Sequence, residues 1–418
     1  MKTASFGETA PCVHGSVLAM YASSRAALFL FLYTVIHQSG YWCACGEAGD
    51  TQEGFQAAVL VEMDSVTVTW KSTEGTRYRL EKSDDLTIWQ TVADPYPSMG
   101  ATESLLSYKD PTGGMRQKQS YYRVSALPPF IELMTIGNAG NLEDSRDGDP
   151  YTAGVQRYGA VNHVYRIGKY EVTYGQYAEF LNAVASTDPH SLFNPAMESD
   201  WAFGGIERRG DPGRYQYHIK PGFRLKPVVY VSFWDACRFC NWLHNSMPRG
   251  TQNQATTENG AYDLTRVEAV AENLVTRRSG ARYFLPSENE WYKAAYHDPR
   301  QSSAGGPPEN SRYWLFPTSS QARPLAEPPP GVGNSANYIY SVNGGSLTEV
   351  GAYTATSTYY GLFDCAGNAW EWNEGIAGSS GQYRALRGSA WFLEITLEAS
   401  GRWGGNPAYE NFPGVGFR

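Results

Sequence analysis

The sequence predicts two folded parts, a small all-β sandwich followed by a larger, irregular α+β domain. The chain has 418 residues, of which 42% are hydrophobic and 14% aromatic, enough for more than one packed core. Only 18% are charged and glycine is frequent, a composition typical of short strands and ordered loops rather than long helices. Pro128-Pro129 indicates a linker between the parts, because consecutive prolines favour extended backbone.

Residues 1–46 are predicted to be a signal peptide. Arg25 precedes an apolar run over residues 26–36, which is too short to cross a bilayer but matches the hydrophobic region of a secretory leader. Two alternatives stay open, a buried N-terminal helix and a lipid anchor at Cys45. Removal of a leader would make the protein secreted, periplasmic or attached to the cell surface, with no stable membrane span.

Residues 52–127 show the two-residue alternation of half-buried β-strands. Val66, Val68 and Trp70 alternate with Ser and Thr, and turn-forming clusters separate four or five such segments. The run Y-R-L-E-K-S-D-D-L-T-I-W, with a later Y-Y-R-V, resembles fibronectin type III modules of exported bacterial proteins. That resemblance implies a spacer or adhesion module without chemistry of its own.

Helices in residues 131–418 are predicted from their N-terminal caps. In a capping box, a Ser or Thr hydroxyl accepts an amide of the first turn, and the side chain three residues later accepts the amide of the capping residue. Loops rich in Gly, Pro and Asn separate these boxes, which favours an irregular α+β domain. The pairs are Thr173 with Gln176, Ser232 with Asp235, and Ser287 with Glu290.

The charge distribution argues against a nucleic-acid partner. The formal net charge is -8, and the sequence contains no block of Lys and Arg residues. Binding to a phosphate backbone draws most of its affinity from clustered basic residues. We therefore expect no nucleic-acid partner.

Six segments of the second part occur in a distinctive order. They read Y-E-V-T-Y-G-Q-Y-A-E-F-L-N-A-V, P-V-V-Y-V-S-F-W-D-A-C-R-F-C-N-W-L, Y-F-L-P-S-E-N-E-W-Y-K-A-A, G-L-F-D-C-A-G-N-A-W-E-W, L-R-G-S-A-W and G-V-G-F-R. Together they resemble the formylglycine-generating enzyme, or sulfatase-modifying factor, family over residues 131–418. The resemblance implies a C-type-lectin-like fold, an exported or lumenal location and bound calcium. In the founding members it also implies copper-dependent oxidation of a substrate cysteine to formylglycine.

The resemblance implies a calcium site around G-N-A-W-E-W. Calcium takes six to eight hard oxygen ligands, which carboxylates and exposed carbonyls spaced around a turn can supply. A second calcium loop of the family would begin at Asn337 and Tyr338. The alternative is that the G-N-A-W-E-W loop is simply tied into the core, with Glu371 capping backbone amides. The ligands carry over to the side chains of Asp364 and Glu371 and the carbonyls of Gly367 and Ala369.

The copper site of the family has no counterpart in this chain. By the resemblance, its two cysteines fall at Leu393 and Glu398, and no cysteine follows Cys365. Monovalent copper selects sulfur ligands, which neither leucine nor a carboxylate provides. Copper is therefore not expected, and no catalytic residue is assigned. Cys237 and Cys240 form a C-x-x-C among aromatic neighbours, which favours buried structural thiols.

A binding groove is expected near Trp391 and Arg402. The aromatic-rich segments 194–217 and 313–316 would either floor this groove or pack onto the core. The leading interpretation is an extracytoplasmic, calcium-stabilised module that binds a peptide or a glycan. The first alternative is an atypical formylglycine-generating oxidoreductase acting on proteins, with a different metal centre. The second is a structural surface component.

Overall fold

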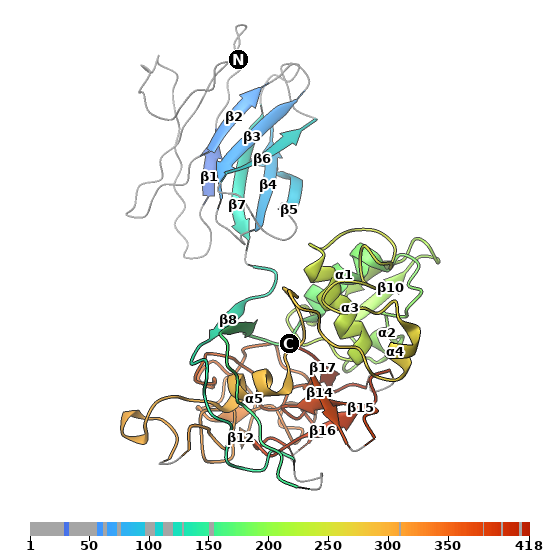
Figure 1. The fold of residues 1–418 in the computed structure, drawn as a ribbon. Coiled ribbons are helices and arrows are strands. Elements are labelled where there is room, and N and C mark those ends of the chain that lie inside the picture. The colour runs from blue at the N-terminus through green and yellow to red at the C-terminus, as the bar shows by residue number, and fades with distance from the viewer. Residues whose placement is uncertain are drawn as a thin grey trace. The chain divides into compact units, whose positions relative to one another are not determined.

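The computed structural model separates the chain into two compact units, residues 1–129 and 130–418 (Figure 1). Each unit is considered by itself. The described residues are 29–32, 57–61, 65–72, 77–96, 105–111, 120–127, 129–149, 154–308, 311–378, 380–393, 396–408 and 412–418.

The described strands of the first unit form two antiparallel sheets with a shared core. One sheet has the strand order β1-β7-β4-β5 and the other β2-β3-β6. Trp70 and Leu80, one from each sheet, lie in the same buried cluster. The alternation predicted along β3 is confirmed, because every second side chain of Val66–Trp70 is buried. The strands are β1 Phe29–Leu32, β2 Ala57–Val61, β3 Val66–Lys71, β4 Arg77–Ser83, β5 Gln90–Tyr96, β6 Leu105–Asp110 and β7 Tyr121–Leu127.

Four residues of the predicted leader are described, and they form a strand. Phe29–Leu32 is strand β1, which pairs antiparallel with β7 at the edge of the sheet. Extended backbone over these residues contradicts the alternative of an N-terminal helix there. The remainder of the predicted leader, Cys45 included, lies outside the described residues, and export stays a prediction.

The three predicted capping boxes of the second unit are confirmed. They open α1 (Tyr174–Val184), α3 (Phe233–His244) and α5 (Glu288–Tyr296). Helices α1 and α3 pack together through aromatic rings, with the ring of Phe180 centred 5.4 Å from Phe239 and 5.2 Å from Trp242. Every residue of α3 except its last is buried, so this helix runs through the core.

Short strands and long ordered loops complete the second unit, in agreement with the irregular α+β domain predicted. Its largest sheet has the order β16-β15-β14-β17, with β17 parallel to β14 (Figure 1). The strands are β8 Leu133–Ile136, β9 Tyr165–Gly168, β10 Ile206–Arg209, β11 Gln216–Ile219, β12 Leu325–Ala326, β13 Ser335–Ala336, β14 Trp370–Ala377, β15 Tyr383–Arg387, β16 Trp403–Gly405 and β17 Val415–Gly416. The short helices are α2 Ala196–Ser199, α4 Val267–Ala271 and the 3-10 turn η1 Ser302–Ala304.

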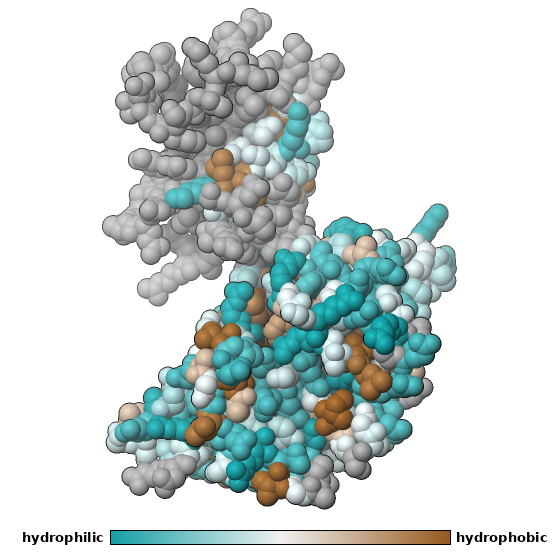
Figure 2. Space-filling model, in the orientation of Figure 1, coloured by the Kyte–Doolittle hydropathy of each residue, from teal (hydrophilic) through white to brown (hydrophobic). Residues whose placement is uncertain are grey.

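The surface of the second unit is polar over most of the face seen in Figure 2. Hydrophobic residues on that face form separate patches among hydrophilic ones. Within the described parts of the chain, every helix is too short or too polar to span a bilayer.

Candidate functional site

The two predicted calcium loops meet through backbone pairing. Asn337 and Gly367 form an isolated parallel bridge, and the Asn368 amide donates to the Asn337 carbonyl at 2.8 Å. Gly367 has a φ of +77°, and a Cβ there would collide with that carbonyl, so the close approach requires glycine. Tyr338 is buried beside the bridge and donates its hydroxyl to the Pro324 carbonyl at 2.5 Å.

The two predicted carboxylate ligands have different surroundings. Both oxygens of Glu371 are engaged, because the Arg418 guanidinium donates to them at 2.7 and 2.9 Å and the Trp291 indole donates to one of them at 2.7 Å. Asp364 accepts the Gly351 amide through one oxygen at 2.6 Å. Asp364 is thus the more accessible ligand, whereas Glu371 is the partner of a buried arginine.

A third carboxylate, Glu171, lies in this cluster and was not predicted. It accepts the Ala369 amide at 3.1 Å and the Asn368 side-chain amide at 3.0 Å. Burial raises the pKa of Glu171 well above its ordinary value, and the charges of Asp364 and Glu371 raise it further. Burial also raises the pKa of Asp364 to about 6. The signal in the sequence was the carboxylate of Glu171 between Tyr170 and Val172 in the Y-E-V-T motif.

The acidic cluster, defined as Glu171, Asp364 and Glu371, offers carboxylate oxygens, the ligand type that calcium takes. Glu171 and Glu371 are buried and Asp364 is half-buried, and the charge of one guanidinium, that of Arg418, acts on all three carboxyl groups. Glu371 does not fit the predicted ligand role, because Arg418 and Trp291 use its oxygens. Within the described ranges, no three acidic, His or Cys side chains converge as metal ligands. Backbone carbonyls would therefore have to supply much of the coordination.

The positions that carry the copper cysteines in the resembling family hold no sulfur here. Leu393 is half-buried, and its amide donates to the Ala390 carbonyl at 3.1 Å. Glu398 is 40% exposed and pairs with Arg323 at 3.3 Å. A leucine and a solvent-exposed ion pair do not fit a monovalent copper ion.

The cysteines of the described residues are buried thiols. Cys237 and Cys240 lie on α3 and Cys365 directly follows Asp364, and all three are free. Burial raises the pKa of each thiol above its ordinary value, so all three stay protonated at neutral pH. This confirms the prediction that the thiols of the C-x-x-C are buried.

Trp391 is the centre of an aromatic cluster, defined here as Trp391, Phe203, Tyr340 and Phe392. The Phe203 ring stacks on Trp391 with centroids 4.2 Å apart and planes 18° apart. Tyr340 and Phe392 approach it edge-on at 5.4 and 4.9 Å. Trp391 is almost buried, whereas Tyr340 is 52% exposed and presents the cluster to solvent. The structure therefore joins the predicted segment 194–217 to Trp391.

The other aromatic segment does not contribute to this cluster. Tyr313 and Phe316 are buried, each in a hydrophobic cluster of the core. The Tyr313 hydroxyl donates to the Leu142 carbonyl at 2.7 Å, and this hydrogen bond holds segment 313–316 against the core. The alternative that segment 313–316 packs onto the core is confirmed. The alternative that this segment forms the floor of the binding groove is wrong.

Arg402 lies inside the domain. It donates to both oxygens of Glu288 at 2.7 Å and to Asp149 at 2.7 Å, and Arg387 donates to the same Glu288 at 2.9 Å. These four side chains are all buried. The guanidinium of Arg402 is therefore not placed to contact a ligand in an open groove.

Residues 137–418 match the family model of the sulfatase-modifying factor enzyme 1-like domain, over more than half of the chain. The chain belongs to this family. It is also similar to the serine/threonine-protein kinase pkn1 of Chlamydia caviae, with 24% identity over 347 residues. That similarity covers 79% of this chain and 44% of the kinase, so the chain spans less than half the length of this relative.

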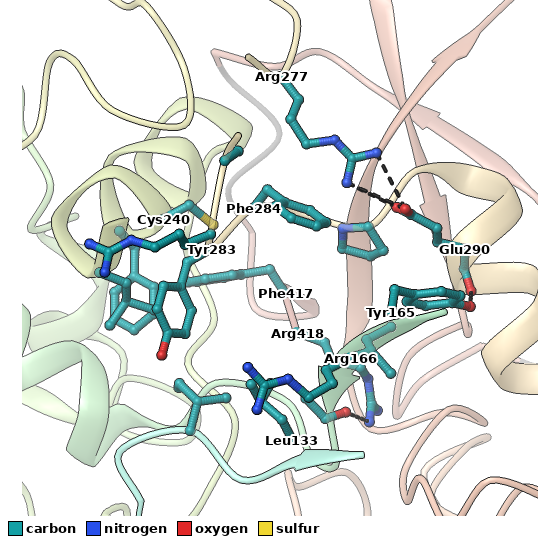
Figure 3. Close-up of a pocket in the computed structure, with 18 of the residues that line it drawn as sticks. Leu133, Tyr165, Arg166, Cys240, Arg277, Tyr283, Phe284, Glu290, Phe417 and Arg418 are labelled. Atoms are coloured by element: carbon teal, nitrogen blue, oxygen red, sulfur yellow. Dashed lines mark hydrogen bonds and ion pairs between the residues drawn. The ribbon is translucent and has the colours of Figure 1, made fainter. Parts of the chain in front are cut away.

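The sulfatase-modifying-factor domain also contains a pocket of about 350 Å³ that no sequence pattern indicated (Figure 3). It is bordered by β8, β9, α3, segment 277–286 and the residues that follow β17. In Figure 3, Arg277 reaches toward Glu290, and its guanidinium lies 4.0 Å from the ring centre of Phe284. Leu393, Glu398 and Trp391 do not line this pocket. It is thus separate from the positions that correspond to the copper cysteines.

Proposed function

We propose that residues 131–418 form a C-type-lectin-like binding module that holds calcium and recognises a peptide or a glycan, without copper-dependent oxidation. The single observation that carries this proposal is the aromatic cluster around Trp391. It lies within two residues of Leu393, which stands where a copper ligand of the family would be. A stacking surface next to the lost metal position supports recognition rather than chemistry.

The exposed ring of Tyr340 gives this cluster a surface on which a ligand can stack. Aromatic faces stack on the apolar faces of sugars and on aromatic side chains of peptides. The Phe203 ring stacks on Trp391 and Tyr340 contacts the same indole edge-on, so Tyr340 rests on a packed support. A rigid platform loses little conformational entropy when a ligand binds.

Calcium would support the module from the acidic cluster. Asp364 and the carbonyls of Gly367 and Ala369 would hold the ion, and Glu171 would balance its charge. The ion would compensate carboxylates that the fold buries, so its contribution is to stability. No step of a reaction is assigned to it.

The setting that fits this function is outside the cytoplasm. The predicted leader supports export to the periplasm, the cell surface or the medium. Residues 52–127 would be a fibronectin type III-like spacer, in line with two sheets that share one core.

Enzymatic activity provides the first test. Purified protein is supplied with copper, oxygen and a cysteine-containing peptide, and mass spectrometry follows the conversion of cysteine to formylglycine. We expect no conversion above that of a heat-denatured sample. Copper-dependent turnover would refute the proposal and support the oxidoreductase alternative.

Ligand binding provides the second test. The protein is screened on glycan and peptide arrays, and the hits are compared with Tyr340→Ala. We expect the substitution to weaken binding by about 3- to 10-fold, because one aromatic contact contributes about 0.5–1.5 kcal/mol beyond its buried area. Tyr383→Ala removes a similarly exposed tyrosine, 41% exposed on β15, and should leave binding unchanged. Equal losses in both variants would contradict a site at Tyr340.

A further inference from the structure

The pocket in Figure 3 is lined by more cations than anions. Five arginines contribute to its lining, against one acidic side chain, that of Glu290. Glu290 is already paired, with Arg277 at 3.2 Å and with His163 at 3.0 Å. The arginines are Arg166, Arg277, Arg278, Arg282 and Arg418.

Three of the five arginines have carboxylate partners. Besides Arg277, Arg278 pairs with Asp263 at 2.9 Å, and Arg418 is committed to the buried Glu371. Their charge is therefore balanced inside the protein. Any unbalanced positive charge in the pocket must therefore come from the other two arginines, Arg166 and Arg282.

Arg166 and Arg282 have no carboxylate within ion-pair distance in the part of the chain that the structure describes. Both are exposed and line the pocket, Arg166 from β9 and Arg282 from segment 277–286. Arg282 donates to the carbonyl of His244 and to the Ser246 hydroxyl, contacts that fix the guanidinium without neutralising it. The pKa of His244 is lowered by burial first and then by the Arg282 charge, as a positive potential requires.

The rest of the lining is apolar or aromatic. Phe417 and Phe239 are buried, and Tyr283 and Phe284 are half-buried side chains of segment 277–286. A volume of about 350 Å³ is at the lower end of the range for small-molecule sites, and it suits one ring or a short chain. Guanidinium groups at the edge of such a site favour a planar or tetrahedral anion, which they can bind with two parallel hydrogen bonds.

We propose that this pocket binds a small amphiphilic anion, an aryl or alkyl carboxylate or phosphate ester, with its apolar body against Phe417 and Phe284 and its anionic group between Arg166 and Arg282. This site is independent of the aromatic cluster around Trp391. It requires neither calcium nor a reaction, because the protein offers only charge and apolar surface.

Four probes test this proposal: phenyl phosphate, phenylacetate, benzyl alcohol and inorganic phosphate. Each probe is titrated at millimolar concentrations against the full chain and followed by calorimetry or ligand-observed NMR. We expect the two aryl anions to bind, benzyl alcohol and inorganic phosphate to bind at least about tenfold more weakly, and higher salt to reduce binding. No binding by either aryl anion, or equal binding by benzyl alcohol, would overturn the proposal.

Two variants locate the site. Arg166→Gln and Arg282→Gln should each weaken phenyl phosphate binding by about tenfold, because each removes a charged hydrogen-bond donor. The control Arg209→Gln makes the same charge change at a side chain that is 65% exposed on β10, outside the pocket, and should bind as the parent does. Circular dichroism and the melting temperature verify that the variants are folded. Unchanged binding in both pocket variants would refute the assignment. Tyr340→Ala should leave phenyl phosphate binding unchanged, which would show that the pocket and the aromatic cluster are separate sites.

Discussion

Replacing Arg418 by methionine should strongly destabilise the sulfatase-modifying-factor domain. The guanidinium is fully buried and makes five hydrogen bonds, two to the Glu371 carboxylate and three to the carbonyls of Gly168, Lys169 and Phe363. Methionine fills much of the same volume but leaves the Glu371 charge without its partner. Breaking a buried ion pair in this way costs about 3–5 kcal/mol. The lost contacts to carbonyls act in the same direction.

The free energy of unfolding, from urea denaturation in EDTA, measures this effect. Arg209→Met provides the control, because an exposed arginine at a surface ion pair should change stability by no more than about 0.5 kcal/mol. Adding Glu371→Gln to Arg418→Met should recover part of the loss, since the second substitution removes the unpaired charge. A loss below about 1 kcal/mol in Arg418→Met, or strictly additive losses in the double variant, would refute the reasoning.

Three further predictions follow from the described side chains. Because the pKa of Asp364 is raised to about 6 in the folded state, its contribution to stability is complete below about pH 4 and is lost as the pH rises through 6, by at most about 3 kcal/mol. In EDTA the melting temperature should therefore fall more between pH 4.5 and 7.5 for the parent than for Asp364→Asn, and calcium should remove that difference; parallel pH profiles would contradict it. Cys237, Cys240 and Cys365 should react with a thiol reagent only in denaturant, so fast labelling of the native protein would show that they are accessible. Ser232→Ala should lower the unfolding free energy by about 1 kcal/mol through loss of the α3 cap, while Ser232→Thr, which keeps the hydroxyl, should lose less.

One proposed site would bind a cation, calcium, and the other an amphiphilic anion, and one residue borders both sites. Arg418 lines the pocket and also pairs with Glu371 of the acidic cluster. The ion pair with Glu371 balances the charge of Arg418, so anion binding in the pocket depends on Arg166 and Arg282 instead. Metal analysis and anion titration therefore test different parts of the domain.

Local patterns determined the secondary structure and the family. The capping boxes at Thr173, Ser232 and Ser287 involve residues three positions apart, so the sequence alone indicates where these helices begin. The alternation over Val66–Trp70 is equally local, because side chains of a strand point to opposite faces. The ordered segments of residues 131–418 carried the family likeness, which the match over residues 137–418 supports.

Only the tertiary structure decided which charges are available to ligands. Arg402 was expected in a groove, but it pairs with Glu288, 114 residues away in the chain, inside the core. Glu171 joined the acidic cluster, and Arg166 and Arg282 lined one pocket, although no spacing in the sequence links them. Burial and ion pairing depend on segments that folding brings together from distant parts of the chain. A residue's type therefore indicates what chemistry it can perform, and its long-range neighbours determine whether it is free to do so.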